Sequence, residues 1–510
     1  MQIARRIAQV VFIVLFFVLF LSATFPYETW LPSDLFLRLD PLIGFTASLS
    51  ARTLIIKSLL ALLVLIPTIL MGRMFCGWVC PLGTTIDAVD GTVKRKRIND
   101  KSSGLFRLRW LKYMILIAIL VSALFSVQIA GYLDPISLLT RTTVTVLYPV
   151  LVLVLDGLIG SLFSVSFLEE IAFGISEFLR GSVLPVQSQS FQGTILIALM
   201  FTAILSFAIF QKRFWCRNLC PLGALLGLFS KFRVYKRIVS DQCTSCSICQ
   251  KQCRMGAIES DFKTTDQYEC INCMDCQTIC PVNAISFKFA KTAPASAFSL
   301  DRRKTLQAGL SGLFAMGLFR IGQFNVVNKD KVIRPPGALE EPEFLDRCIR
   351  CGECVRICST SGAGLQLTAL ESGWEGLSTP ALITPMGYCE YNCNLCGQVC
   401  PTGAIQNLTM EQKHEAKMGT AHFDKTRCIP WYYGDNCMVC EEHCPVSPKA
   451  IQFSTQKITT IDGRTAEIFL PFVDESLCIG CGICTKVCPV VGDRGIFLTS
   501  DGETRFADDT

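Results

Sequence analysis

The sequence predicts an α-helical membrane domain joined to α+β ferredoxin-like domains. Three observations lead to this fold class. The 510-residue chain is 51% hydrophobic and only 18% charged, whereas soluble domains average about 25% charged residues. Four apolar runs are long enough to cross a bilayer. All 28 cysteines fall into seven groups of four with short, regular spacings.

The four apolar runs cover residues 8–24, 53–71, 111–130 and 192–210. Basic residues gather on one side of them: before the first run, in the loop 94–112, and directly after the fourth run. The opposite loop, 131–191, contains only two arginines. The positive-inside rule therefore places the N-terminus inside and residues 231–303 in the cytoplasm.

Residues 143–165 are also apolar and complicate this count of membrane spans. One extra crossing would place the basic loops that follow it on the outer side, against the positive-inside rule. The stretch contains Pro149 and Asp156, and a return crossing would bury Glu169, Glu170 and nearby charges. We therefore expect residues 143–182 to form a re-entrant or interfacial cap on the outer side.

Residues 305–324 are a weaker fifth candidate for a membrane-spanning helix. They follow Arg302-Arg303, and a twin arginine before an apolar stretch is typical of a signal for export in the folded state. Residues 325–510 are then expected outside. This agrees with the charge distribution, since these residues carry 16 Lys and Arg against 24 Asp and Glu, a net charge of −8, while residues 1–324 carry +14. The alternative is a buried or membrane-surface helix.

Two cysteine groups, at 243–253 and 270–280, share the spacing C-x2-C-x2-C-x3-C. In this pattern three cysteines bind one [4Fe–4S] cluster and the fourth reaches the other cluster. One predicted site is Cys243, Cys246, Cys249 and Cys280. The other is Cys270, Cys273, Cys276 and Cys253. Zinc and disulfides are the alternatives, but a reducing compartment disfavours disulfides, and paired repeats are unusual for zinc.

Four more groups lie between residues 341 and 500, and sixteen ligands predict four further [4Fe–4S] clusters. The first and fourth groups have ferredoxin spacing, whereas the second opens with three intervening residues and the third with eight. In an exported domain a disulfide framework is the alternative, although cysteines so close together pair poorly. The groups are Cys348, Cys351, Cys354, Cys358; Cys389, Cys393, Cys396, Cys400; Cys428, Cys437, Cys440, Cys444; and Cys478, Cys481, Cys484, Cys488.

The last four cysteines belong to an internal repeat, R-x2-C-x3-C-P-L-G, at 73–83 and again at 213–223. Cysteines at i and i+4 share one face of a helical turn. Two adjacent turns would therefore bring Cys76, Cys80, Cys216 and Cys220 to one point, and we call these four cysteines the repeat quartet. A metal ion, a cluster, disulfides or four inert buried thiols would each fit.

Several functions are disfavoured by what the sequence lacks. Its three histidines all follow residue 413, so the apolar part cannot hold a His-ligated haem, and no Cys-x-x-Cys is followed by His as c-type haem requires. There is no dinucleotide fingerprint or phosphate-binding loop. The basic residues form no stripe of the kind that binds nucleic acid.

These motifs together resemble a known pair of proteins. The first 290 residues resemble NapH-type membrane ferredoxin proteins, through the two repeat turns, Tyr132-Leu133-Asp134-Pro135 and the ferredoxin pair. Residues 300–510 resemble its polyferredoxin partner NapG, through Arg302-Arg303, Arg334-Pro335-Pro336-Gly337-Ala338 and the cysteine groups. The chain thus looks like a natural NapH–NapG fusion.

The resemblance implies a quinol dehydrogenase-type component. In that family, electrons pass from quinol in the bacterial inner membrane to redox partners such as a cytochrome c or a terminal reductase. It implies a multi-pass protein with residues 325–510 in the periplasm. The four-cluster domain is also similar to iron–sulfur subunits of molybdenum oxidoreductases. There the first motif pairs with the fourth and the second with the third, so we expect that pairing here.

The sequence therefore predicts an electron carrier with six [4Fe–4S] clusters, an uncertain repeat quartet, and quinone as substrate. Asp134, Glu169 and Glu170 are the candidate proton acceptors. One alternative is a maturation or regulatory protein that supports assembly of a respiratory metalloenzyme, and another is an all-cytoplasmic ferredoxin reservoir. The expected segments are a NapH-like membrane domain (1–235), a two-cluster ferredoxin domain (236–290), a linker with the export-like segment (291–330) and a NapG-like four-cluster domain (331–510).

Overall fold

The computed structural model describes residues 2–27, 29–92, 108–164, 169–182, 184–185, 191, 193–290, 302–324, 332–369, 371–459 and 465–506. The chain divides into two compact units. The helical unit consists of Met1–Leu21, Leu31–Thr142 and Ile195–Leu318. The cysteine-rich unit consists of Ser22–Trp30, Thr143–Thr194 and Phe319–Thr510. This division cuts across the four expected segments, because the ferredoxin segment belongs to the helical unit.

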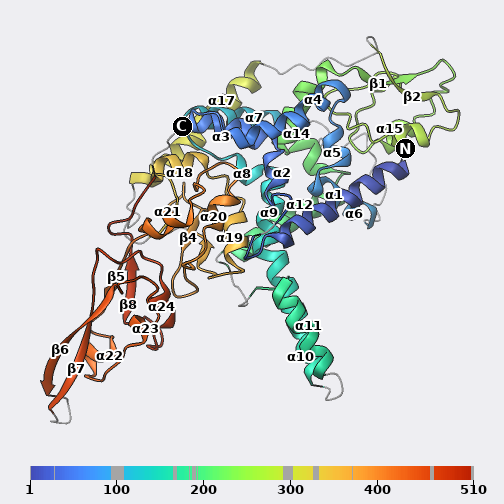
Figure 1. Ribbon diagram of the computed structural model, residues 1–510. Helices are drawn as coiled ribbons and strands as arrows, with labels where there is room; N and C mark the ends of the chain where they lie inside the picture. The colour runs from blue at the N-terminus through green and yellow to red at the C-terminus, as the bar shows by residue number, and fades with distance from the viewer. Residues whose placement is uncertain are drawn as a thin grey trace. The chain divides into compact units, whose positions relative to one another are not determined.

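The helical unit is built from apolar helices, and each predicted membrane run contains one (Figure 1). Two helices begin with an Asp-Pro pair: Asp40 caps the first, accepting from the N–H groups of Leu42 and Ile43, and Asp134 caps the second. The elements are α1 (Gln2–Ser22), α2 (Leu35–Arg38), α3 (Pro41–Ala51), η1 (Ile56–Ala61), α4 (Leu62–Met71), α5 (Met74–Trp78), α6 (Pro81–Thr92), α7 (Trp110–Leu124), α8 (Ala130–Leu133), α9 (Pro135–Thr142), α12 (Thr194–Ser206), η5 (Phe207–Ile209), α13 (Phe214–Asn218), α14 (Pro221–Phe229) and η6 (Ser230–Phe232).

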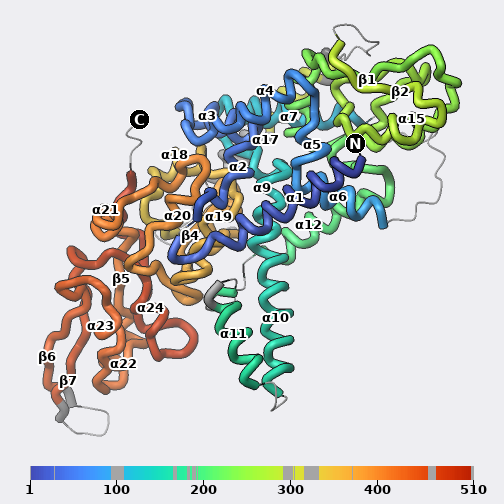
Figure 2. Tube along the Cα trace, turned by 45° about the vertical axis from the view of Figure 1, so that its right-hand side comes forward, coloured from blue at the N-terminus to red at the C-terminus, as the bar shows by residue number. Residues whose placement is uncertain are grey.

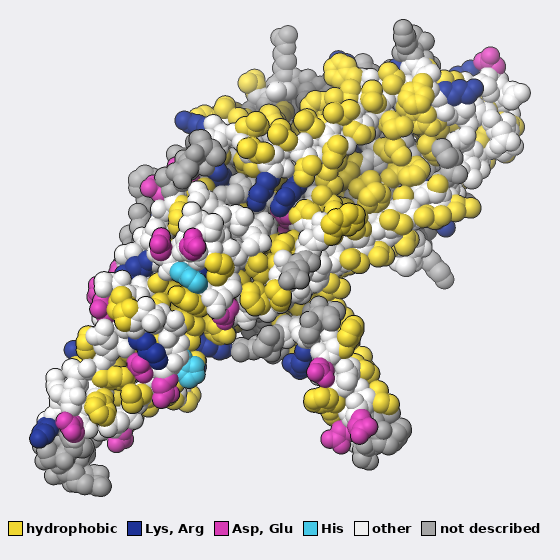
Figure 3. All heavy atoms as spheres, in the orientation of Figure 1, with side chains coloured by type: hydrophobic (Ala, Val, Ile, Leu, Met, Phe, Trp, Pro, Cys, Tyr) yellow, Lys and Arg dark blue, Asp and Glu magenta, His cyan; other side chains and the backbone are white. Residues whose placement is uncertain are grey.

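Among the described residues, two continuous helices are long and apolar enough to cross a membrane, Gln2–Ser22 and Pro135–Phe163. The other predicted runs form shorter apolar helices, Ile56–Met71, Trp110–Leu124 and Thr194–Ile209. Only 28% and 17% of the two long apolar windows are buried, which differs from the core helix of a soluble protein. Figure 3 shows apolar side chains gathered over the helices of this unit.

The stretch 143–182, expected as a re-entrant or interfacial cap, is helical throughout most of its length. The π-turn η3 (Thr143–Leu147) joins α9 to α10 (Tyr148–Phe163), so that one continuous helix runs from Pro135 to Phe163. The helix α11 (Glu169–Ser182) then packs back against α10 as a hairpin (Figures 1 and 2). Pro149 and Asp156, which the sequence analysis noted in this stretch, both lie within the continuous helix.

The ferredoxin segment folds as a small module within the helical unit. Its strands β1 (Tyr235–Val239) and β2 (Ile285–Phe289) pair in antiparallel register, with Tyr235 opposite Phe289. The short helices α15 (Ile248–Gln252) and α16 (Asp275–Thr278) each carry part of a cysteine motif. In both views the module lies beside the N-terminal end of α1 (Figure 2), where Arg5 contacts Asp275 at 3.3 Å.

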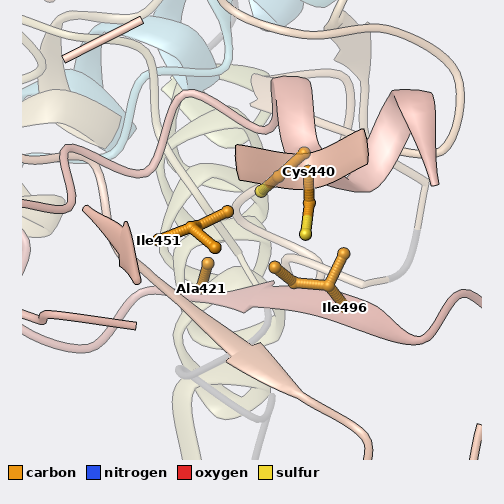
Figure 4. Packing of buried hydrophobic residues seen from close by; sticks show 5 residues of the cluster. Ala421, Cys440, Ile451 and Ile496 are labelled. Atoms are coloured by element: carbon orange, nitrogen blue, oxygen red, sulfur yellow. The ribbon is translucent and has the colours of Figure 1, made fainter. Parts of the chain in front are cut away.

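Apart from the hairpin of α10 and α11, the cysteine-rich unit consists of short helices and two-stranded antiparallel sheets. The sheets are β3–β4, β5–β8 and the β6–β7 hairpin. Figure 4 shows one of its small cores, where Ala421, Ile451 and Ile496 surround Cys440. The elements are α18 (Glu341–Arg347), α19 (Glu353–Cys358), β3 (Leu365–Leu367), β4 (Pro380–Leu382), α20 (Leu395–Gln398), α21 (Met410–Glu415), β5 (Thr420–Phe423), α22 (Ile429–Tyr432), α23 (Val439–Glu442), β6 (Ile451–Thr459), β7 (Thr465–Val473), α24 (Ile483–Val487) and β8 (Ile496–Thr499).

Two segments from the N-terminal part of the chain pack into this unit. Ala23 is fully buried against Ile357, Leu395 and Val399. The guanidinium of Arg356 lies 4.2 Å from the centre of the Tyr148 ring. Ala23 lies at the end of the first predicted membrane run, and Tyr148 lies in the stretch that was expected to form a cap on the outer side.

The predicted fifth span is the helix α17 (Arg302–Phe324), which begins at the twin arginine pair. In the described part of the chain it is not one of the helices that are long and apolar enough to cross a membrane. The residues on either side, 291–301 and 325–331, lie outside the described residues, as do the basic residues 93–107.

Candidate iron–sulfur sites

Four cavities in the structure are each lined by four cysteines. Their atom-free volumes, open solvent included, are similar, between about 330 and 390 Å³. Similar cavities with the same four side chains fit the same kind of group, and [4Fe–4S] clusters are held by four cysteine thiolates. In the described residues no three His, Cys, Asp or Glu side chains come close enough to share a single metal ion.

In the ferredoxin module the cysteines are arranged as the spacing predicts. One cavity is lined by Cys253, Cys270, Cys273 and Cys276, which we call the second ferredoxin site. Cys280 and Cys249 belong to one core that also contains Cys253 and Cys276, and Cys249 interacts electrostatically with Cys243 and Cys246. Cys243, Cys246, Cys249 and Cys280 are the cysteines predicted for the first ferredoxin site. At the second site, the fourth cysteine of the first motif, Cys253, lies with the first three of the other motif.

The pairing that we expected in the four-motif region is wrong. The structure pairs the first motif with the second and the third with the fourth, because α19 packs against α20 and α23 packs against α24. Cavities are present at three of the sites, and at site B the thiol of Cys358 interacts with those of the second motif. Site A is Cys348, Cys351, Cys354 and Cys400; site B is Cys358, Cys389, Cys393 and Cys396; site C is Cys444, Cys478, Cys481 and Cys484; and site D is Cys428, Cys437, Cys440 and Cys488.

The four motifs with ferredoxin spacing share an unusual backbone conformation. In each, the residue before the second cysteine and the residue after it have positive φ. Single left-handed residues are costly unless the residue is glycine. Their recurrence at equivalent places indicates that the loops are shaped around a common group. The residues are Ser245 and Ser247, Asn272 and Met274, Arg350 and Gly352, and Gly480 and Gly482.

Backbone N–H groups point at several of these sulfur atoms. Ala257 N–H donates to Cys253 Sγ, and Ala284 N–H donates to Cys280 Sγ, both at 3.3 Å. Leu365 N–H donates to Cys358 Sγ at 3.5 Å. Hydrogen bonds to sulfur favour the negatively charged form and help to set the reduction potential of a bound cluster.

The sites of the cysteine-rich unit follow one another in the order A, B, C, D. The thiol of Cys354 in site A interacts with that of Cys396 in site B. Cys389 N–H of site B donates to Cys481 O of site C at 2.8 Å. Cys484 of site C and Cys440 of site D share one core.

The repeat quartet is assembled as predicted from two equivalent turns. Helix α5 (Met74–Trp78) and helix α13 (Phe214–Asn218) have the same length and lie 140 residues apart in the sequence, and both are followed by a helix that begins with proline. Cys220 caps α14, and its sulfur accepts from Gly223 N–H at 3.3 Å. The C-P-L-G sequence is therefore a helix start in which cysteine is the capping residue.

All four thiols of the repeat quartet are buried, with no more than 8% of each residue exposed. Burial raises the pKa of Cys216 to about 11 and raises the pKa values of Cys80 and Cys220 well above the usual range. Repulsion between neighbouring thiolates adds to this effect. A bound metal reverses this tendency, since a coordinating thiol loses its proton. The guanidinium groups of Arg73 and Arg213 are buried beside them.

The candidate proton acceptors fall into two kinds. Asp134 is fully buried and forms a side-chain hydrogen bond with Asp40, which the sequence did not single out. Burial raises the pKa of both carboxyl groups. Glu169 and Glu170 are exposed in the first turn of α11. The sequence Asp-Pro occurs at both positions, 40–41 and 134–135, and this similarity could have identified Asp40 from the sequence.

Two basic residues have a different role from the one the sequence suggested. Lys112 and Arg109 belong to the basic loop that set the predicted membrane orientation. Lys112 is fully buried, with its Nζ 2.5 Å from the Glu269 carboxylate. Arg109 donates to Gly256 O at 2.6 Å. Both residues thus attach the ferredoxin module to α7.

Comparison with known protein families agrees with these sites. Profiles described as 4Fe-4S binding domains match residues 56–99, 193–239 and 396–415, residues 263–286 and 471–491, and residues 345–361. The first of these profiles covers both turns of the repeat quartet. No solved structure matches the chain.

Curated relatives include ferredoxin-type proteins from several bacteria. The methylamine utilization ferredoxin-type protein MauM of Methylorubrum extorquens is 34% identical over 191 residues, covering 37% of this chain and 82% of that protein. MauM of Paracoccus denitrificans is 37% identical over 32% of this chain and 70% of that protein. The ferredoxin-type protein NapG of Escherichia coli is 37% identical over 31% of this chain, and the chain spans 65% of its length.

Proposed function

The chain belongs to the family of ferredoxin-type proteins NapG and MauM, and we propose that it carries electrons from membrane quinol to a redox partner protein. Its matches establish a ferredoxin-type iron–sulfur electron-transfer protein with multiple [4Fe–4S] clusters. The proposal adds the membrane, the quinol and the number of sites: six ferredoxin-type sites and a seventh at the repeat quartet.

The observation that carries the proposal is the unbroken order of cysteine sites within each unit. [4Fe–4S] clusters supply one-electron redox chemistry when bound. The cysteines hold sites A to D as successive neighbours. In the helical unit, the two ferredoxin sites share a core, and Cys273 interacts with Arg213 beside the repeat quartet. Such an order suits an electron carrier.

We propose that the protein lies in the bacterial inner membrane with one cysteine-containing part on each side. The contacts that segments of the chain make with each part support this arrangement. Segments expected on the cytoplasmic side, Arg73 and Lys112 among them, contact the ferredoxin module. Ala23, at the outer end of the first predicted run, and Tyr148, in the expected outer cap, pack within the cysteine-rich unit. We propose that residues 1–235 form a NapH-like domain with four or five spans, and that residues 331–510 lie in the periplasm as a NapG-like domain.

The Asp40–Asp134 pair supports a quinol reaction at the outer side. Quinol oxidation releases protons as well as electrons, and a proton acceptor must lie near the ring. Two neighbouring buried carboxyl groups with raised pKa values are suited to accept a proton and to pass it on. We therefore propose that Asp134, with Asp40, accepts the quinol proton.

The experiment that tests the function is quinol oxidation by membranes containing the protein, with a soluble electron acceptor present. The proposal predicts sustained turnover, and turnover below one tenth of wild type in a Cys389→Ser variant, because that change interrupts the order of sites between A and C. A protein that only supports assembly of a metalloenzyme gives no sustained turnover. In that case a deletion strain is rescued by the target enzyme supplied in assembled form.

The side of the cysteine-rich unit is tested separately with reporter fusions after Asn325 and after Thr510. Reporters that work only outside the cytoplasm should be active at both positions. Activity of cytoplasm-only reporters at both positions would instead identify an internal ferredoxin reservoir and contradict the exported arrangement.

A further inference from the structure

The repeat places an arginine three residues before the first cysteine of each copy, and each arginine crosses to the other copy. Both side chains are fully buried. Arg213 donates from Nη1 to Cys76 O at 2.8 Å and from Nη2 to Gly83 O at 3.2 Å. A residue of the second turn therefore closes the first turn.

Arg73 makes the equivalent crossing in the other direction. A Cβ placed on Gly223 would lie 2.6 Å from Arg73 Nη2 and 3.5 Å from Cys216 O. The guanidinium of Arg73 thus lies against the Cys216–Gly223 turn. A side chain at Gly223 would collide with this guanidinium. The arginine that opens the motif therefore requires the glycine that ends it.

The carboxylates that hold the two arginines come from different parts of the chain. Arg213 forms a two-pronged ion pair with Asp87 of α6, with both contacts at 2.7 Å. The position equivalent to Asp87 in the second copy, 140 residues later, is Gly227. A Cβ on Gly227 would lie 3.0 Å from Tyr268 O. The missing side chain therefore makes room for the ferredoxin module.

Glu269 of that module takes the place of the missing carboxylate. Arg73 Nη1 donates to Tyr268 O at 3.0 Å and to Glu269 Oε2 at 3.2 Å. Glu269 is itself held by Lys112 and directly precedes Cys270 of the second ferredoxin site. The next residues also contact the first turn, since Trp78 Nε1 donates to Asn272 O at 3.1 Å.

The two arginines differ in the donors that remain. All three nitrogens of Arg213 donate to protein acceptors. In the described part of the chain, Nε and Nη2 of Arg73 have no hydrogen-bond partner, although both are buried. Buried guanidinium donors need acceptors, and the nearest charged neighbours of Arg73 include Cys76 and Cys220.

We propose that Arg73 donates from Nε and Nη2 to sulfur atoms of an iron–sulfur cluster held by the repeat quartet, and that Glu269 of the ferredoxin module fixes Arg73 there. The inference rests on the proposed cluster at the repeat quartet. Arg73 is then a positioning residue that sets the reduction potential of that cluster, because a positive donor stabilises the reduced, more negative state. Through Glu269, this potential depends on the docked ferredoxin module.

The test is a redox titration of the full-length protein, followed by EPR, with the quartet signal identified by its loss in Cys220→Ser. In Arg73→Gln the ratio of reduced to oxidised quartet cluster should fall at least tenfold at a fixed potential, which is 59 mV for a one-electron couple. Arg73→Lys keeps the charge and should restore part of the shift. Glu269→Gln removes a negative charge and should move the ratio in the opposite direction.

The matched control is Arg237→Gln. Arg237 is also buried, its Nη2 lies 3.7 Å from Cys249 Sγ, and it lines the cavity of the second ferredoxin site. This change should shift the midpoints of the ferredoxin sites and leave the quartet signal unchanged. Retained EPR signals of the second ferredoxin site show that each variant has folded, and Arg73→Lys provides the same readout if Arg73→Gln does not fold.

The outcomes separate the two proposals. If no wild-type signal disappears in Cys220→Ser, the repeat quartet holds no cluster and that part of the proposed function is wrong. If the signal exists but keeps its midpoint in both Arg73 variants, the role of Arg73 is overturned while the cluster stands. An unchanged midpoint in Glu269→Gln overturns the link to the ferredoxin module.

Discussion

At the scale of single residues, the role of each cysteine depends on which three others share its cavity. Cys400 lines the cavity of the first motif, and Cys488 lines the cavity of the third. The two cysteines occupy equivalent last positions in their motifs, so substituting them tests the pairing directly.

We predict that Cys348→Ser combined with Cys400→Ser removes one cluster, because both residues belong to site A. Cys348→Ser combined with Cys488→Ser should remove two clusters, since site D is then lost as well. The losses are about four and about eight iron atoms per chain, at four for each cubane. Iron and acid-labile sulfide analysis measures them, and the reverse result would restore the pairing of first with fourth motif.

The cysteines of the second ferredoxin site could be predicted from the spacing, since Cys253, Cys270, Cys273 and Cys276 line one cavity. The pairing of the four later motifs could not. Their spacings contain insertions, and the choice depends on which short helices pack together, α19 on α20 and α23 on α24. The contact between Arg73 and Glu269 also could not be predicted from the sequence, because the two residues lie 196 positions apart.

The buried pair Asp40–Asp134 predicts a pH dependence. Burial raises the pKa of both carboxyl groups, although Arg141 opposes part of the rise at Asp134. The folded protein therefore keeps a proton that the unfolded chain releases near pH 4. The contribution of this pair to the free energy of unfolding should be largest at low pH and should fall as pH rises from about 4 through the raised pKa.

Asp134→Asn should flatten this dependence, because the amide cannot ionise but its oxygen can still accept from Ile136 and Ser137. Thermal unfolding in detergent between pH 4 and pH 8 provides the measurement. The control is Asp156→Asn, which changes the partly exposed pair with Arg180 and should leave the slope as it is. A slope that survives in Asp134→Asn would show that the pair is not its source.

At the scale of elements, the two C-P-L-G turns depend on small residues where other groups approach closely. Gly227 of α14 leaves room for Tyr268 O and for the Tyr113 hydroxyl, which would lie 3.2 Å from a Cβ. We predict that Gly227→Ala loosens the ferredoxin module and destabilises the protein by about 1–3 kcal/mol through overpacking.

Gly91→Ala in α6 is the matched control, because no atom lies within 4 Å of a Cβ there. It should be neutral or stabilising by up to about 1 kcal/mol, the helix preference for alanine over glycine. Thermal unfolding and limited proteolysis of the ferredoxin module measure both variants. Equal stability of the two would contradict the close approach at Gly227.

Helix positions could be predicted better than helix lengths. Each apolar run contains a helix, since long apolar stretches without breakers favour one. Gly72 and Gly193, which have positive φ, border two of the shorter helices. The continuous helix Pro135–Phe163 was not foreseen, because the sequence does not show the π-turn η3 through which the helix continues to Pro149 and beyond.

At the scale of the whole molecule, the seven groups of cysteines predict the metal content. Six ferredoxin-type sites and the repeat quartet would hold about 28 iron atoms, at four for each cubane. The variant Cys76→Ser with Cys220→Ser should hold about 24 and keep all other EPR signals. An unchanged count between the two proteins would mean that the repeat quartet binds no cluster.

The most direct test of the central claim is EPR of the clusters after quinol is added to anaerobic membranes containing the oxidised protein. The account predicts that quinol reduces clusters of sites A to D in the wild type, and that the Asp134→Asn variant is reduced at least tenfold more slowly. Clusters that stay oxidised with quinol, while dithionite reduces them fully, would contradict a quinol-driven electron carrier.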